Sequence, residues 1–306
     1  MRIKLGTRLF LGLASTSGLV LICALAGYQG IHNLSAALGY LSGPVWDTGR
    51  GATSVRAGVQ AELLAVSELL GSDRRDGERV ALEQAEQSTD QAAARMFASA
   101  LIEAESREAF MRDLRTFREA RTEVLDAHDR YRRANARVLE EFYRFQELML
   151  DVQRLGDGYM EELAAFPGED LSWTTTLRPR WAAAKAALES RISLLARFFH
   201  FQRALSQGLD ADALAELDYY LGVMEETFAE ITGHPTLGPL PLTQGEFAGQ
   251  SVAAVLDERA RAHVEGFEQT LEAFRGLRAS TQRYRAASQS LLVMAEDIVQ
   301  AGDARI

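Results

Sequence analysis

The first 28 residues constrain the fold of this chain more than any later segment. Residues 1–8 carry three basic side chains, and residues 9–28 form an uncharged apolar run. A helix of about 20 residues is roughly 30 Å long, which matches the hydrocarbon thickness of a membrane. The run therefore predicts one transmembrane helix over residues 9–28. The alternative is a cleaved signal peptide, with the Ala-Leu-Ala at residues 24–26 as its cleavage site.

Charge places the rest of the chain on the outer side of that membrane. The nearby positive charge precedes the apolar run, so the positive-inside rule puts residues 1–8 in the cytoplasm and residues 30–306 in the periplasm of a bacterial inner membrane. The only cysteine, Cys23, lies within the run, so the exported part has no disulfide. A net charge of −10 argues against nucleic acid as a partner.

The exported part consists of long Ala-, Leu-, Arg- and Glu-rich stretches with helical periodicity and no useful strand alternation. Breakers divide it into six predicted helices, near residues 31–70, 76–103, 108–166, 172–207, 211–233 and 250–303. Ser172 and Asp210 are the predicted caps of the fourth and fifth helices. A tight turn is expected at residues 105–107, although no Gly or Pro marks it.

The lengths of these helices constrain how they pack. Short connections make successive helices antiparallel. The first helix then climbs about 60 Å from the membrane, and the last descends about 80 Å and returns near it. This predicts an all-α fold of two stacked antiparallel four-helix bundles that share two long helices. The membrane-proximal bundle takes about residues 30–130 plus 275–306, and the membrane-distal bundle about residues 131–274.

Arginines supply the candidate site of the proximal bundle. The chain has two lysines, so 31 of its 33 basic residues are arginines. Height estimates put one arginine from each of three helices in the same layer as Tyr284, and a small carboxylate is held well by such bidentate partners. The predicted ligand-binding residues here are Arg56, Arg95, Arg118 and Tyr284. The competing interpretation is that these arginines are solvated and pair with glutamates.

Aromatic residues supply the candidate site of the distal bundle. The predicted ligand-binding residues here are Phe142, Tyr143, Phe199, His200, Tyr220 and His263. One interpretation is a pocket walled by rings, with Arg197, His200 or Arg203 making a polar contact, or a cage for a quaternary amine. The other is an ordinary packed core.

Signatures of catalysis are missing from the sequence. The five histidines lack metal-ligand spacing, and there is no Gly-rich phosphate loop, nucleophile elbow or paired-carboxylate pattern. We therefore expect no enzymatic activity, no metal and no cofactor.

The basic-then-apolar opening at residues 7–12 (TRLFLG) and Pro44 before a polar–apolar helix resemble bacterial chemoreceptors and sensor kinases. Residues 30–306 resemble the helical bimodular sensor domain of chemoreceptors for organic acids and, in related form, of the trimethylamine N-oxide sensor kinase. The resemblance implies two stacked four-helix bundles and a homodimer. It also implies that arginines of the first helix bind dicarboxylates, and Arg56 matches these by position.

The same resemblance implies a second membrane helix, a HAMP linker and a signalling module after Ile306. We therefore expect the ligand-sensing region of a methyl-accepting chemotaxis receptor truncated before that helix, rather than a single-pass accessory protein. Its ligand would be a small organic molecule, a carboxylate or an amine. The alternatives are a histidine kinase input domain that recognises a periplasmic binding protein through an exposed apolar patch at the start of the fourth helix and residues 233–247, and a membrane-anchored structural bundle.

Overall fold

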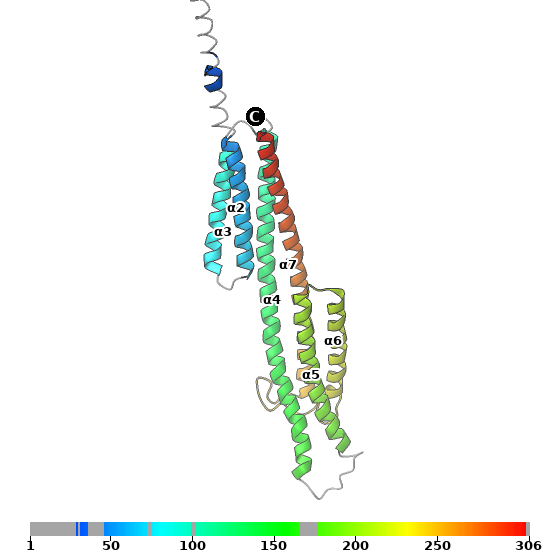
Figure 1. Ribbon diagram of the computed structural model, residues 1–306. Coiled ribbons are helices and arrows are strands. Elements are labelled where there is room, and N and C mark those ends of the chain that lie inside the picture. The colour runs from blue at the N-terminus through cyan, green and yellow to red at the C-terminus, as the bar shows by residue number, and fades with distance from the viewer. Residues whose placement is uncertain are drawn as a thin grey trace, which may run out of the picture. The chain divides into compact units, whose positions relative to one another are not determined.

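A computed structural model of the chain describes residues 29, 31–35, 46–71, 75–98, 102–165 and 177–303. Its long helices are α2 (Trp46–Gly71), α3 (Arg75–Met96), α4 (Ala104–Ala165), α5 (Arg178–Ser206), α6 (Ala211–Thr232) and α7 (Val252–Asp303) (Figure 1). The β structure of these ranges is limited to an isolated bridge between Pro241 and Ser251. The predicted all-α class is therefore confirmed for the described part of the chain.

The predicted membrane helix at residues 9–28 lies outside the described residues and stays a prediction. The same holds for Ser172 as a helix cap. Among the helices that the structure does describe, none has the length and apolar character needed to cross a membrane.

The chain divides into two compact units. Unit 1 comprises the described residues up to 122 and from 282 on, and unit 2 comprises the described residues between 123 and 281. Unit 1 contains α2, α3, the first part of α4 and the last part of α7, and unit 2 contains α5, α6 and the remaining parts of α4 and α7. Helices α4 and α7 therefore contribute to both units.

Close packing of α2 on α3 shapes unit 1, and the two helices lie side by side in Figure 1. Gly51 and Gly58 of α2 are buried and face α3. A Cβ atom at Gly51 would lie only 2.7 Å from the backbone Cα of Met96, and one at Gly58 would collide with Thr89. Glycine is therefore what allows these two backbones to approach so closely.

Unit 2 has a large apolar core in which α5 packs along α6. Core residues that α4 and α7 supply include Phe142, Phe145, Met149, Val255 and Leu256. Asp210 caps α6, because its carboxylate accepts a hydrogen bond of 2.7 Å from the backbone nitrogen of Ala213, so this predicted cap is confirmed. Gly208 takes a φ of 79° in the turn before the cap, a conformation that glycine adopts without strain.

Asp151 holds the connection between α6 and α7 against α4. This buried carboxylate accepts hydrogen bonds from the backbone nitrogen of Thr243 (2.8 Å), the Thr243 hydroxyl (2.7 Å) and the backbone nitrogen of Gln244 (3.2 Å). Arg259 of α7 stacks over the Phe247 ring at 4.5 Å. The connection is therefore anchored from two helices of unit 2.

The predicted turn at residues 105–107 is wrong. Helix α3 ends at Met96, seven residues before the predicted end at 103, and α4 begins at Ala104. Glu105 lies in the first turn of α4, where a carboxylate interacts favourably with the unpaired backbone N–H groups of a helix start. Phe97 packs edge-on against Phe110 at 5.4 Å, which fixes the chain just after α3.

Candidate functional site

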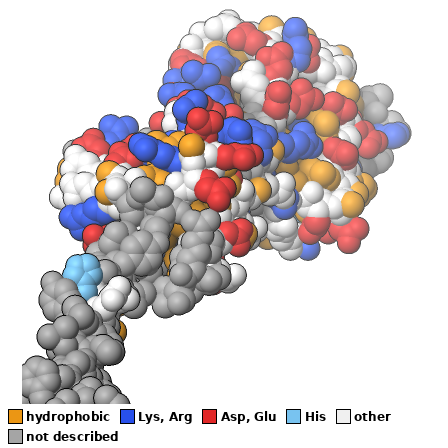
Figure 2. Space-filling model, turned by 90° about the horizontal axis from the view of Figure 1, so that it is seen from above, with side chains coloured by type: hydrophobic (Ala, Val, Ile, Leu, Met, Phe, Trp, Pro, Cys, Tyr) orange, Lys and Arg blue, Asp and Glu red, His pale blue; other side chains and the backbone are white. Residues whose placement is uncertain are grey.

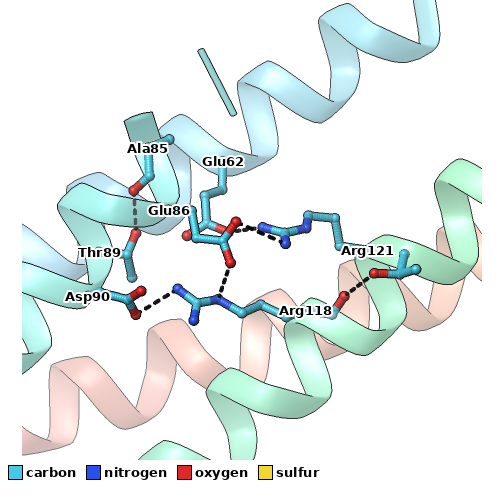
Figure 3. A network of polar contacts seen from close by, with 8 residues as sticks. Glu62, Ala85, Glu86, Thr89, Asp90, Arg118 and Arg121 are labelled. Atoms are coloured by element: carbon cyan, nitrogen blue, oxygen red, sulfur yellow. Dashed lines mark hydrogen bonds and ion pairs between the residues drawn. The ribbon is translucent and has the colours of Figure 1, made fainter. Parts of the chain in front are cut away.

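Unit 1 contains a network of acidic and basic side chains from three helices, which runs from the buried Glu62 to the exposed Asp90 (Figure 3). Glu62 of α2 is fully buried and accepts a hydrogen bond of 2.8 Å from Arg121 of α4. The other nitrogen of that guanidinium lies 3.3 Å from Glu86 of α3. Arg118 bridges Glu86 (3.4 Å) and Asp90 (2.8 Å). Three carboxylates thus neutralise two guanidinium groups.

Burial raises the pKa of two groups in this region, the Glu62 carboxyl and the Tyr284 hydroxyl. It raises the pKa of Glu62 above its ordinary value, although the neighbouring Arg121 and Arg118 oppose that shift. Tyr284 of α7 is also buried and stacks on Phe117 with ring centroids 5.1 Å apart. Burial, and then the charge of Glu62, raise the pKa of its hydroxyl. An incoming carboxylate would have to displace a glutamate or aspartate from this network.

The structure separates the predicted arginines of unit 1 from one another. Arg118 belongs to the network, and Tyr284 interacts with it electrostatically. Arg56 instead forms an ion pair of 3.3 Å with Glu296 at the surface, where both side chains are about half exposed, and it lines a cavity of about 110 Å³. Arg95 is exposed on α3. Neither Arg56 nor Arg95 hydrogen-bonds to the network within the described ranges.

The predicted aromatic residues of unit 2 divide between core and surface. Phe142 is buried and stacks on Phe198 at 3.8 Å, whereas Tyr143 and Phe199 are 61% and 64% exposed. His200 stacks on Tyr220 at 4.3 Å, and its Nδ1 lies 2.9 Å from a carboxylate oxygen of Glu216. Of the six predicted residues, only Phe142 and His263 therefore lie in the core.

Surface arginines lie among acidic residues. On the face drawn in Figure 2, basic and acidic side chains are interspersed rather than gathered by sign. In unit 2, Arg203 forms an ion pair of 2.9 Å with Glu216, and Arg144 forms one of 2.8 Å with Glu140. Such exposed pairs contribute little to stability, and they identify no binding site.

Arg197 differs from all of these arginines. Its side chain projects from α5 into the core of unit 2, and the residue is only 3% exposed. Its guanidinium lies 4.7 Å from the centre of the Phe267 ring and donates a weak hydrogen bond to the Met224 sulfur at 4.0 Å. Its Nε has no hydrogen-bond partner, and no carboxylate of the described chain lies within ion-pair distance. Burial lowers the pKa of Arg197 to about 10, so it stays charged at neutral pH.

His263 of α7 packs beside this arginine. The imidazole lies 4.2 Å from the Phe267 ring and 5.5 Å from the Phe145 ring, and the residue is 2% exposed. Neither ring nitrogen has a hydrogen-bond partner among the described residues. Burial, and then the charge of Arg197, lower the pKa of His263 to about 3, so the ring is neutral.

Small hydroxyl side chains continue this polar layer along α5 and α6. Ser190 and Ser193 precede Arg197 by two turns and one turn, and so lie on the same face of α5. The Ser193 hydroxyl lies 3.1 Å from that of Thr227 on α6. The Ser190 hydroxyl is buried and has no partner in the described part of the chain. The core of unit 2 thus contains donors from α5 and α7 that have no hydrogen-bond partner among the described residues.

Unit 2 also has a surface cavity of about 370 Å³ between α4 and the α6–α7 connection. Arg154 on its wall donates a hydrogen bond of 2.8 Å to Gln244, and Asp151 is fully occupied by the connection. Arg154 and Asp151, two polar residues that line this cavity, therefore hold the α6–α7 connection in place. No group of three or more metal-ligating side chains gathers within the described ranges.

In the sequence, Arg197 was predicted only as one of three residues that could make a polar contact. Its position on α5 is the stronger sign that it is buried. Buried residues of α5 recur at helical spacing, and Arg197 falls on that stripe between Leu194 and Phe201. Glu62 falls in the same way between Val59 and Val66 of α2. Comparison with known protein-family models and with curated proteins finds no match to the chain.

Proposed function

We propose that this chain is the extracytoplasmic ligand-sensing region of a transmembrane bacterial signal-transduction receptor of the chemotaxis type. In this proposal residues 9–28 anchor it in the inner membrane, and units 1 and 2 are the proximal and distal four-helix bundles of a stacked pair. The lengths of α4 and α7, 62 and 52 residues, support that arrangement because each contributes to both units.

One observation carries the proposal: around Arg197 and His263 in unit 2, buried polar atoms have no hydrogen-bond partner in the described part of the chain. A helical bundle that served only as a support would gain stability from apolar side chains at these positions, since an uncompensated buried charge is costly. A ligand that completes these hydrogen bonds would compensate that cost.

Signalling would use the helix that holds part of the site. His263 and Phe267 lie on α7, which continues from unit 2 through unit 1 to Asp303. A ligand that binds one position of α7 relative to α5 more tightly than another would shift the balance between two states of the receptor. Displacements of about 1–2 Å along a helix are typical of such transitions.

The test is a thermal-shift screen of the full chain in detergent against carboxylates, inorganic anions, amino acids, amines and N-oxides. We expect one class to raise the unfolding midpoint, and His263→Phe to weaken that response while Phe199→Ala leaves it unchanged. No response from any class would contradict ligand sensing.

The alternative is a histidine kinase input domain that recognises a periplasmic binding protein. An exposed apolar stripe on α5 favours it, formed by Trp181, Leu188, Ile192, Leu195 and Phe199, which are 39–64% exposed. Under this alternative Ile192→Glu abolishes capture of a binding protein, and the small-molecule screen finds no stabilising ligand.

A further inference from the structure

The exposed face of α5 is mostly apolar. From residue 181 to residue 199 its exposed residues are Trp181, Lys185, Leu188, Ile192, Leu195 and Phe199, which we call the α5 seam. The exposed face of α6, by contrast, includes the acidic residues Asp212, Asp218, Glu225, Glu226 and Glu230. Scattered apolar side chains are normal on a surface, but a continuous row of large ones indicates an interaction surface.

The spacing of the α5 seam is that of a coiled coil. Its residues are alternately four and three positions apart, which is the heptad repeat with which two helices pack along a shared line. Ile192 and Phe199 fall at the a positions of the heptad, and Leu188 and Leu195 fall at the d positions. A β-branched residue at a with leucine at d favours a parallel pair of helices. The seam therefore matches a second copy of itself.

Lys185 is the charged residue of the seam, and its charge is compensated within α5. Its ammonium lies 3.3 Å from a carboxylate oxygen of Glu189 and 5.7 Å from the centre of the Trp181 ring. A partner helix therefore does not have to supply a counter-ion. A single lysine at an a position also fixes the register of a coiled coil, at some cost in stability.

Charges beside the seam favour a parallel pair over an antiparallel one. Glu189 and Arg191 flank the seam on opposite sides, at an e and a g position. In a parallel pair the g side of one helix faces the e side of the other, so Arg191 lies toward Glu189 of the second copy. In an antiparallel pair like sides meet, and each of these charges would face its own counterpart of the same sign.

The seam is large enough for a stable pair. Its five apolar side chains are 39–64% exposed. They present on the order of 400 Å² of apolar surface, so two copies bury about 800 Å² of it. Because apolar atoms form a little more than half of a typical interface, the whole contact falls within the roughly 1,200–2,000 Å² of stable complexes.

We infer that two copies of this chain pair through the α5 seam, parallel and in register, as a two-stranded coiled coil. The parallel arrangement agrees with the proposed function, on which this inference rests for the anchoring of both copies in one membrane. A binding protein on the same stripe of α5 would compete with the second copy.

The first test is disulfide cross-linking of the full chain in lipid vesicles. Cys23, the only cysteine, is first replaced by serine. Ile192→Cys and Phe199→Cys are then oxidised separately, with Glu226→Cys on the exposed face of α6 as the matched control. A parallel pair in register links each seam variant to its own copy as the main product, because like a positions lie within disulfide reach. An antiparallel pair would place the two copies of residue 199 at opposite ends of the seam.

The second test is sedimentation of the full chain in mild detergent over a range of concentrations. Ile192→Glu places a charge in the seam and should raise the dissociation constant of the pair about tenfold or more. Tyr219→Glu is the matched control, because Tyr219 is 66% exposed on α6 and lies outside the seam. It should leave the dissociation constant unchanged. Both positions are exposed in one copy, so the thermal midpoint of the monomer should change little in either variant.

Three results would overturn the inference. They are a monomeric chain, including one in which α5 holds a binding protein instead; cross-linking of Phe199→Cys no faster than that of Glu226→Cys; and a pair whose affinity Ile192→Glu leaves unchanged. A monomer that still responds in the thermal-shift screen would overturn the pairing and leave ligand sensing intact. A chain that pairs through α5 but responds to no ligand would support the pairing and contradict ligand sensing.

Discussion

Two neighbouring glycines of α2 should respond in opposite directions to the same substitution. Gly51→Ala adds a methyl group where a Cβ atom would lie 2.7 Å from both the Cα and the backbone nitrogen of Met96. Gly49→Ala adds the same group where no atom lies within 4 Å. Both changes gain helix propensity, so the difference between them isolates the packing of α2 on α3.

The magnitude follows from these contacts. Replacing glycine by alanine in a helix is worth about 1 kcal/mol from propensity alone. Overpacking costs about 1–3 kcal/mol, and the upper part of that range applies at Gly51 because a backbone cannot rotate away as a side chain does. We expect Gly51→Ala to lower the free energy of unfolding by about 1–2 kcal/mol, and Gly49→Ala to raise it by up to about 1 kcal/mol.

Thermal unfolding of the full chain in detergent, followed by far-ultraviolet circular dichroism, measures both variants. The expected fall for Gly51→Ala is roughly 2–8 °C. If Gly51→Ala were as stable as the wild type, or if the two variants shifted in the same direction, the close approach of α2 and α3 would be refuted.

Three further predictions concern ionisable groups. Burial lowers the pKa of His263 to about 3. The contribution of the neutral ring to the free energy of unfolding is therefore complete above the ordinary histidine pKa of about 6.5 and is lost as pH falls below that value. His263→Phe should reduce this loss of unfolding free energy at acid pH by up to about 1.4 kcal/mol per pH unit. Unfolding curves at several pH values test this, and equal slopes in both proteins would contradict it. Asp151→Ala should cost about 1–3 kcal/mol and speed amide exchange of Thr243, whose backbone nitrogen loses its acceptor; unchanged exchange would count against that anchor. Arg56→Ala removes an exposed ion pair with Glu296, so it should change the free energy of unfolding by no more than about 1 kcal/mol. A larger change in thermal unfolding would contradict a weak, solvent-exposed pair.

Local sequence signals predicted the helical elements well wherever a breaker or cap is chemically distinctive. Asp210 after Gly208 marks the start of α6, because a carboxylate that accepts a backbone hydrogen bond is a strong helix-start signal. The end of α3 could not be placed, because no glycine or proline follows Met96. Contact between Phe97 and Phe110 fixes the chain there, and sequence alone does not reveal that pairing.

Site residues were harder to predict because neighbours on a helix point in different directions. Phe198 and Phe199 are adjacent in sequence, yet Phe198 packs against the core and Phe199 is 64% exposed. Height along a bundle cannot separate them, since helical phase decides which one faces inward. The same phase identifies Arg197 and Glu62 as polar residues on apolar stripes, a stronger signal than the number of arginines in a layer.

Hydrogen exchange of the full chain in detergent, with and without the stabilising ligand from the screen, tests most directly whether unit 2 holds the ligand. Binding at Arg197 and His263 should slow amide exchange in α5 and in the part of α7 around Phe267, and Arg197→Met should remove that protection. Protection confined to the Glu62 network of unit 1, or protection that persists in Arg197→Met, would contradict a ligand site in the core of unit 2.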